Sequence, residues 1–277
     1  MDEMRFIEKL NSDNMIFHYT TSKTAIEDIL PKNTLKLSKL INTNDPYEYK
    51  FMLFGGVGWG KVTEELIRDK HNPASTLLNK MRRNYCKIAC FTMNGRIKGY
   101  LKTRMWTQYG DNHKGVCFVF NKDKLVENIK NQIEVLKEGK VIYNHYKEYE
   151  NITFDFNELD KIEIDVFCKK YLNEKIEYLL FQKEEDFKDE VEYRIIAYKE
   201  DSEDKYIDIG NSLVAIIIGD RFPDGLLPSL SFFSKIIDVP CRRVYWEHGV
   251  PHILYCGTNG NKYEDEYDKL GLNPNKI

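Results

Sequence analysis

The chain lacks paired cysteines, long apolar runs and an excess of charge of one sign, and each absence excludes a class of protein. Its six cysteines include no Cys-x-x-Cys pair, and no cluster of histidines completes a zinc site. We therefore expect reduced thiols and no metal. The longest strongly apolar run, residues 213–218, is far shorter than the roughly 20 residues of a membrane-spanning helix. A net charge of -3 argues against a dedicated duplex-DNA binder.

The amino-terminal residues, MDEMRFIEKLNSDN, have no apolar segment of the kind that a secretory signal contains. Together with unpaired cysteines, this predicts a cytoplasmic protein without a membrane partner. Apolar residues make up 42% and charged residues 31% of the 277 residues, which is typical of a folded globular protein. We expect a single α+β domain over residues 1–258 with helical insertions, followed by a polar tail over residues 259–277.

Hydrophobic spacing predicts short strands mixed with helices. Strands are expected at 15–19, 35–38, 87–92, 115–120, 190–198, 213–218, 235–238 and 252–255. Helices are expected at 24–30, 64–68, 76–85, 101–109, 122–137 and 160–182. Because these elements do not alternate regularly, we expect an α+β fold with mixed, mainly antiparallel sheets and flanking helices.

Three polar segments are candidates for chemistry, and the first is Phe-His-Tyr-Thr at residues 17–20. It lies at the end of a predicted strand and the start of a helix. His18 can exchange hydrogen bonds with ribose hydroxyls, and Thr20 can cap the helix or contact a ligand. The alternative interpretation is a partly buried histidine beside an ordinary helix cap.

The second segment, residues 105–115, combines large aromatic side chains with a polar turn. Trp106 and Tyr109 offer flat surfaces on which a nucleobase or a nicotinamide ring can stack. In the alternative interpretation, Trp106 fills the core and an ordinary turn follows.

The third segment, Glu-Val-Glu-Tyr-Arg at residues 190–194, alternates like a strand. Side chains two residues apart share one face of a strand, so Glu190, Glu192 and Arg194 are expected to point the same way. A carboxylate held there can stabilise an oxocarbenium-like ribosyl centre, while the arginine orients it. A row of charges on a solvated sheet surface is the alternative.

Four stretches together resemble a widespread bacterial family of domains of unknown function, over roughly residues 16–220. Its members show a Tyr-His-Tyr-Thr-like start, an Asn-Asp-Pro turn, a Met-Trp-Ser-x-Tyr-x-x-x-His-x-Gly stretch and a Glu-x-Glu-(Trp/Tyr)-Arg strand. The matching stretches here are Phe-His-Tyr-Thr-Thr-Ser (17–22), Asn-Asp-Pro-Tyr-Glu (44–48), Met-Trp-Thr-Gln-Tyr-Gly-Asp-Asn-His-Lys-Gly (105–115) and Glu-Val-Glu-Tyr-Arg-Ile (190–195).

That family is in turn similar to the ADP-ribosyltransferase fold, and this resemblance implies an NAD-consuming enzyme. It implies His18 on the first strand, Tyr109 on a second element, with Thr92 or Trp106 as alternatives, and Glu192 on a late strand. Glu192 would stabilise the ribosyl centre, and Glu190 would position or deprotonate the acceptor. The chain departs from the transferase pattern because it has no Ser-Thr-Ser triplet and a long first spacing.

Further positions are expected to bind NAD, as substrate and without a metal: Tyr19, Thr20, Asn44, Asp45, Trp106, Tyr109, His113 and Arg194. The acceptor could be a protein, a nucleic acid or water, so the sequence allows both a transferase and an NAD glycohydrolase. The resemblance also fits a toxin or a phage-defence effector. The alternative is a non-catalytic, nucleotide-sensing module of a defence system.

Residues 55–61 fit the phosphate-binding pattern G-x-x-x-x-G-K. The next residue is Val62, where a magnesium-binding hydroxyl is needed, and the regular strand-helix alternation of that fold is missing. We therefore interpret this segment as a glycine loop rather than an ATP site.

Overall fold

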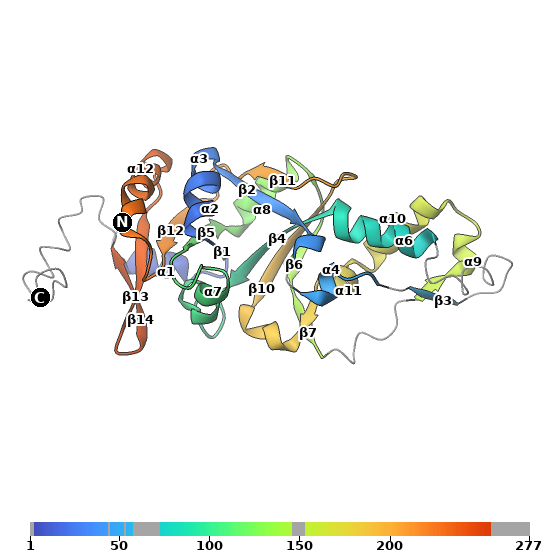
Figure 1. The fold of residues 1–277 in the computed structure, drawn as a ribbon, viewed down its shortest axis with the longest axis horizontal. Helices are drawn as coiled ribbons and strands as arrows, with labels where there is room; N and C mark the ends of the chain where they lie inside the picture. The colour runs from blue at the N-terminus through green and yellow to red at the C-terminus, as the bar shows by residue number, and fades with distance from the viewer. Residues whose placement is uncertain (1–2, 44, 53, 58–72, 146–152, 256–277) are drawn as a thin grey trace, which may run out of the picture. The chain divides into compact units, whose positions relative to one another are not determined.

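A computed structural model describes residues 3–43, 45–52, 54–57, 73–145 and 153–255 (Figure 1). The fold is α+β, with a mixed, mostly antiparallel sheet and several helices. The chain divides into two compact units, each assembled from separate segments. Unit 1 contains residues 1–34, 92–125 and 208–277, and unit 2 contains residues 35–91 and 126–207. Whether both belong to the single expected domain stays a prediction.

Unit 1 is built on strands β1 (Met15–Thr20), β5 (Val116–Asn121), β12 (Leu213–Ile218), β13 (Cys241–Glu247) and β14 (Val250–Tyr255). They pair in this order, and the end of β4 (Cys86–Met93) pairs with β1 on its other side. All pairs are antiparallel except β12 with β13, which are parallel. The helical elements are α1 (Glu3–Leu10), α2 (Ser22–Thr24), η1 (Ala25–Ile29), α3 (Leu30–Lys32), η4 (Gly99–Leu101), α7 (Thr103–Gln108), η7 (Asp224–Leu226) and α12 (Leu227–Ile237).

The core of unit 1 follows from strand alternation. Phe17 and Tyr19 point from one face of β1 into a cluster with Trp106, Val119 and Ile217, all of which are buried. The helix after β1 is capped by Thr21, whose hydroxyl accepts a hydrogen bond from the backbone N–H of Thr24 at 3.1 Å.

Unit 2 carries the strands β2 (Thr34–Lys39), β4, β6 (Glu134–Lys140), β10 (Glu192–Tyr198) and β11 (Lys205–Asp208). β10 pairs antiparallel with β6 and also pairs with β4, which is antiparallel to β2. Two small parallel pairs join β3 (Gly55–Val57) to β8 (Thr153–Asp155) and β7 (Ile142–Asn144) to β9 (Gln182–Glu184).

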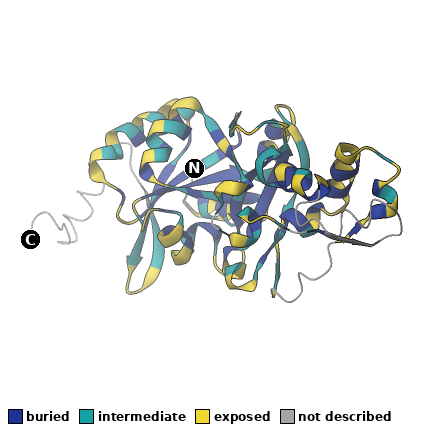
Figure 2. Cartoon of the chain, turned by 45° about the vertical axis from the view of Figure 1, so that its right-hand side comes forward, coloured by how far each residue is buried: buried dark blue, intermediate teal, exposed yellow. Residues whose placement is uncertain are grey.

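The remaining elements of unit 2 are helical: η2 (Leu40–Asn42), α4 (Pro46–Tyr49), α6 (Pro73–Lys80), η3 (Met81–Tyr85), α9 (Phe156–Leu159), α10 (Ile164–Glu174), α11 (Ile176–Leu180) and η6 (Glu185–Glu190). Helix α8 (Lys122–Lys130) contains residues of both units. A second core lies between these helices and contains Phe54, Phe154, Phe167, Tyr171 and Leu179. Figure 2 shows buried residues along the strands and exposed ones on the outer turns of the helices.

Several sequence predictions fail at element boundaries. The helix expected at 122–137 ends at Lys130, and residues 134–140 form β6, because pairing with β10 outweighs the helical spacing. The strand expected at 235–238 is wrong, since these residues end helix α12 and Asp238 caps it in a left-handed conformation. The long helix expected at 160–182 is two helices, α10 and α11. Within the glycine segment, Gly55–Val57 is strand β3, and the rest lies outside the described residues, as does the helix expected at 64–68.

Candidate functional site around Glu192

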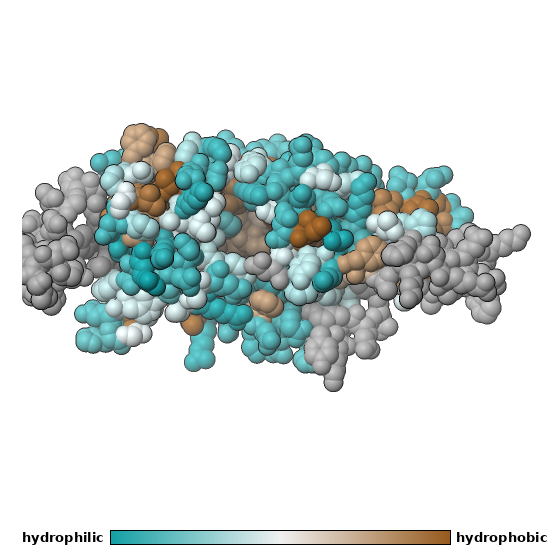
Figure 3. Space-filling model, in the orientation of Figure 1, coloured by the Kyte–Doolittle hydropathy of each residue, from teal (hydrophilic) through white to brown (hydrophobic). Residues whose placement is uncertain are grey.

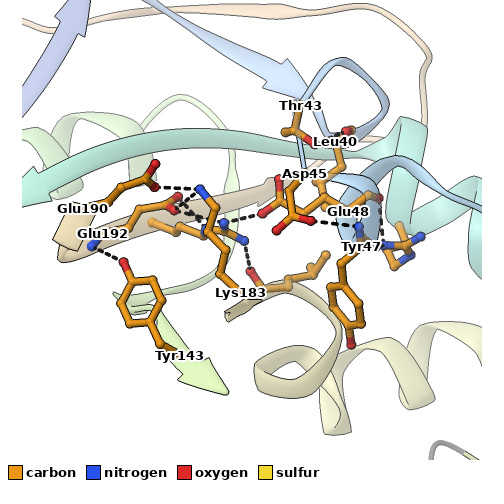
Figure 4. Close-up of polar contacts among 12 residues, drawn as sticks. Leu40, Thr43, Asp45, Tyr47, Glu48, Tyr143, Lys183, Glu190 and Glu192 are labelled. Carbon is orange, nitrogen blue, oxygen red and sulfur yellow. Dashed lines mark hydrogen bonds and ion pairs between the residues drawn. The ribbon is translucent and has the colours of Figure 1, made fainter. Parts of the chain in front are cut away.

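The candidate site of unit 2 begins at the sharp turn before β10. Glu190 ends the helix η6, Val191 is left-handed with φ 48°, and Glu192 is the first residue of β10. This turn aims both carboxylates at Lys183 of β9, whose Nζ lies 2.7 Å from Glu190 Oε2 and 3.1 Å from Glu192 Oε2 (Figure 4). The predicted convergence of Glu190 and Glu192 is therefore present, although the strand starts two residues later than expected.

Arg194 fixes Glu192 from the other side. Its Nε donates to Glu192 Oε1 at 2.6 Å, and its Nη2 donates to Glu192 Oε2 at 3.1 Å. Nη1 donates to the backbone oxygen of Leu180 at 2.8 Å, and Nη2 also forms an ion pair with Glu48. The guanidinium is only 1% exposed, so its charge acts on these partners with little screening by water.

Glu48 reaches Arg194 from the short helix α4, which the Asn-Asp-Pro-Tyr-Glu segment forms. Asp45 caps this helix by accepting a hydrogen bond from Tyr47 N at 2.9 Å, and Pro46 occupies its first turn. At the other end the buried Arg82 donates to the backbone oxygens of Glu48, at 2.8 Å, and Lys50, at 2.5 Å. Two segments that the sequence resemblance singled out, 44–48 and 190–195, thus meet in one ion network.

Three buried carboxylates, Glu48, Glu190 and Glu192, form ion pairs with two buried cations, Arg194 and Lys183, and a third buried cation, Arg82, lies close to Glu48. Burial raises the pKa of Glu192, but the charges of Arg194 and Lys183 outweigh burial and lower that pKa to about 2. Burial raises the pKa of Glu48, and the Glu192 charge raises it further against the opposing effect of Arg194. Glu192 is therefore the firmly ionised carboxylate, and Glu48 takes up a proton more readily.

Two further groups contact Glu192. The backbone N–H of Glu192 donates to the hydroxyl oxygen of Tyr143 at 2.7 Å. The thiol of Cys90, on β4, hydrogen-bonds to the Glu192 carboxylate, and burial raises the pKa of this thiol, so it stays protonated. Sequence analysis missed Tyr143, Cys90, Lys183 and Glu48. Only Glu48 carried a signal, since Asp45 and Glu48 have the spacing of a helix-capping box.

The remaining predicted site residues that the structure describes lie in unit 1. His18 is half-buried on β1, opposite Phe118 of β5, and Thr20 ends this strand. Tyr19 is a core residue whose hydroxyl donates to the backbone oxygen of Gly99 at 2.6 Å, with its ring edge against Trp106.

Trp106 has no exposed surface, and its Nε1 donates to the backbone oxygen of Tyr100 at 2.9 Å. This burial favours core packing over the stacking on nicotinamide that we expected. Tyr109 is half-buried at the end of α7, where its hydroxyl accepts from Gln108 Nε2 at 3.1 Å. The alternative candidate Thr92 is fully buried and accepts a hydrogen bond from Lys102 Nζ at 2.8 Å.

His113 lies in an unusual turn in which three successive residues, Asp111, Asn112 and His113, have φ of 49°, 50° and 70°. Two glycines make the turn fit, because a Cβ on Gly115 would lie 2.2 Å from the backbone oxygen of Thr20, and one on Gly219 would lie 2.1 Å from that of His113. Burial lowers the pKa of His113, which favours the neutral imidazole.

The predicted residues therefore divide between the units. Unit 2 brings together Glu190, Glu192, Arg194 and the helix capped by Asp45. Unit 1 contains the other six positions: His18, Tyr19, Thr20, Trp106, Tyr109 and His113. Asn44 lies outside the described residues. A single site that combines both sets stays a prediction.

Two features of the described residues bear on the kind of site. Among the described residues, no three side chains of His, Cys, Asp or Glu are arranged to hold a metal ion. In the same part of the chain, no helix has the length and apolarity needed to cross a membrane. The five described cysteines are free thiols.

Comparison with known proteins adds one finding. Residues 105–195 match the model of DUF2971, a family described as a protein of unknown function. The match covers less than half of the chain, starts one residue before Trp106 and ends one residue after Arg194. It supports the resemblance to a domain-of-unknown-function family and assigns no activity. No curated protein and no solved structure matches the chain.

Proposed function

We propose that the chain cleaves the bond between nicotinamide and ribose in NAD, as an ADP-ribosyltransferase or an NAD glycohydrolase. The observation that carries the proposal is the state of Glu192, an ionised carboxylate held by Arg194 and Lys183. As nicotinamide leaves, positive charge develops on the ribose, and a carboxylate fixed in advance stabilises that charge without reorganising.

The charge of the whole network supports this role. Glu48, Glu190 and Glu192 converge on Arg194 and Lys183, and a group of carboxylates held close together attracts a positive group. Both the nicotinamide ring of NAD and the developing ribosyl cation are positive. An acceptor hydroxyl or a water would lose its proton to Glu190, which Lys183 holds beside Glu192.

A second candidate function is a non-catalytic module that binds a nucleotide. One observation favours it: the Glu192 side chain is 5% exposed, and both of its oxygens already accept hydrogen bonds. A ribose could replace those donors only if Lys183 or Arg194 moved. In this candidate function the ion network stabilises the fold of unit 2, and no bond is broken.

Nicotinamide release distinguishes the two functions. The purified full-length chain is incubated with NAD, with and without protein and nucleic-acid acceptors, and free nicotinamide is measured by chromatography. The wild type is expected to release nicotinamide. Glu192→Gln is expected to release it on the order of 100-fold more slowly, the loss typical of removing one electrostatic stabiliser of a transition state.

The matched control is Glu185→Gln, which makes the same substitution at an exposed carboxylate of η6 and should leave the rate unchanged. Circular dichroism at the assay temperature confirms that each variant is folded. An active Glu192→Gln would refute the role of this residue. Absence of release under all conditions, with a melting temperature that NAD still raises, would refute the enzyme and support the binding module; absence of both effects would refute both functions.

A further inference from the structure

One carboxylate oxygen of Asp45 is buried without a hydrogen-bond donor among the described residues. Hydrophilic side chains cover most of the face drawn in Figure 3, where water solvates them, but Asp45 is only 6% exposed. Its Oδ1 accepts the hydrogen bond from Tyr47 N, so Oδ2 is the oxygen that lacks a donor. Because a buried oxygen without a donor loses its hydration and gains no bond in exchange, a donor is expected at this position.

The carboxyl group of Glu48 can supply that donor. The backbone N–H of Glu48 donates to the backbone oxygen of Asp45 at 3.0 Å, which places the two side chains on the same turn of α4. In the view of Figure 4 the two carboxyl groups lie next to each other, and the charge of Asp45 acts on that of Glu48. A protonated carboxyl donates one hydrogen bond, whereas a carboxylate only accepts.

The cations around this pair are engaged elsewhere. Arg194 forms its ion pairs with Glu48 and Glu192, and none of the ion pairs of the described residues includes Asp45. Arg82 directs its Nη groups to backbone oxygens of α4 and of the residue that ends it. Burial raises the pKa of Glu48, and so do the neighbouring carboxylates, against two opposing cations. The groups that face the pair are Arg194 and Glu192 of β10, Lys183 of β9, Arg82 of η3 and Cys90 of β4.

We propose that Glu48 holds a proton that it donates to Asp45 Oδ2, and that this shared proton keeps α4 in contact with Arg194. The two carboxyl groups then carry one negative charge between them, and Oδ2 gains the donor that it lacks. Once the proton leaves, two like charges lie one turn apart at a buried position, where water screens their repulsion weakly. A four-residue helix is not stable by itself, so α4 should separate from Arg194 as the pH rises. This pH dependence belongs to unit 2 alone and does not depend on a reaction with NAD.

Helix α9 provides a matched control within the same chain. Asp155 caps α9 by accepting from the N–H two residues later at 2.9 Å, as Asp45 does in α4 at the same distance, and Glu158 follows at the same spacing. Asp155 is exposed, and Glu158 forms an ion pair with Lys170. Water and a cation therefore satisfy these two carboxylates, and no shared proton is expected at α9.

Infrared spectroscopy of the full-length chain tests the shared proton, because the C=O stretch of a protonated carboxyl is separate from the carboxylate bands. At pH 6 a carboxyl with the ordinary pKa of 4.5 is roughly 97% ionised. The wild-type spectrum minus the Glu48→Gln spectrum is expected to contain the band of a protonated carboxyl. Asp45→Asn should remove the band too, because the asparagine still caps the helix and its N–H can donate to an ionised Glu48. The matched substitutions Glu158→Gln and Asp155→Asn should leave the band unchanged. Absence of the band from both difference spectra would overturn the proposal.

Hydrogen exchange, corrected for its intrinsic pH dependence, tests the release of α4. The amides of Glu48 and Tyr49, which donate to the backbone oxygen of Asp45, should lose at least about tenfold in protection between pH 5 and pH 8. The amide of Asp160, at the end of α9, should not change in the same way. Glu48→Gln has no proton to lose at this position, so its α4 should stay protected at both pH values. Protection of α4 that does not depend on pH in the wild type, or a pH-dependent loss that persists in Glu48→Gln, would contradict the role of the proton.

Discussion

Replacing Glu192 with Gln should destabilise the protein far more than replacing Glu48 with Gln, although the two carboxylates share Arg194. The reason lies in their opposite pKa shifts. Two cations lower the pKa of Glu192, whereas burial and the neighbouring carboxylate raise the pKa of Glu48. A glutamine resembles a protonated glutamate, so the substitution removes the strongly favoured ionised state of Glu192, whereas at Glu48, whose pKa is raised, the same substitution costs less.

The expected magnitude follows from linkage. The pKa of Glu192 falls from its ordinary value of 4.5 to about 2, and at 1.36 kcal/mol per unit this corresponds to roughly 3 kcal/mol. A lowered pKa stabilises the fold above pH 4.5, and this stability disappears as the pH falls through 2. A raised pKa has the opposite sign: the contribution of Glu48 is fully present below pH 4.5 and is lost as the pH rises through its folded value.

Urea unfolding followed by circular dichroism at pH 7 and pH 3 measures both effects. At pH 7 we expect Glu192→Gln to cost roughly 3 kcal/mol and Glu48→Gln less than about 1 kcal/mol. At pH 3 the cost of Glu192→Gln should fall to roughly half, because protonation then competes in the unfolded chain. Equal losses for the two variants at pH 7, or a Glu192→Gln cost that does not change with pH, would refute this account of the network.

Two further predictions concern single contacts. Arg194→Met removes the cation that two buried carboxylates share and should cost about 3 to 5 kcal/mol in urea unfolding. The control is Arg243→Met, which removes a half-buried arginine paired with the exposed Asp224 and should cost less than about 1 kcal/mol. A cost for Arg194→Met below that of the control would contradict the role of the ion pairs. Gly115→Ala places a Cβ 2.2 Å from the backbone oxygen of Thr20 and should lower the free energy of unfolding by about 1 to 3 kcal/mol or more. In the control, Gly225→Ala, the added Cβ meets nothing within 4 Å and should change that free energy by less than about 0.5 kcal/mol. Similar melting temperatures for the two variants would show that the turn is not tightly packed.

The sequence predicts elements well where local periodicity and burial agree. Strands β1, β5 and β12 are strongly apolar and lie where the pattern indicates them. It fails at β6, whose residues Glu134–Lys140 contain a helical spacing but pair with β10. Strand propensity depends on the partner strand, and the partner is separated from β6 by a long stretch of sequence.

The candidate site was predictable only in part for a related reason. Strand periodicity predicts that Glu190, Glu192 and Arg194 lie together. They do share one network, although Glu190 reaches it from the end of η6 and not from the strand. Lys183 and Glu48 arrive from β9 and α4, and no spacing in the sequence links those elements to β10. Trp106 shows that residue type alone does not predict a ligand-binding role, because a large aromatic ring can pack in a core as well as stack on a ligand.

The number of buried carboxylates relative to buried cations bears on the function of the ion network. A network that only stabilises a fold gains most when buried charges balance, since each uncompensated carboxylate costs desolvation energy. Here a third carboxylate is present, and burial raises the pKa of Glu48, with a smaller contribution from the charge of Glu192 and against the opposing charge of Arg194. A neutral side chain at position 48 would remove that imbalance and leave Glu192 with both of its cations. An ionised Glu48 would instead suit a site that receives a positive group, such as the nicotinamide ring of NAD in the proposed reaction.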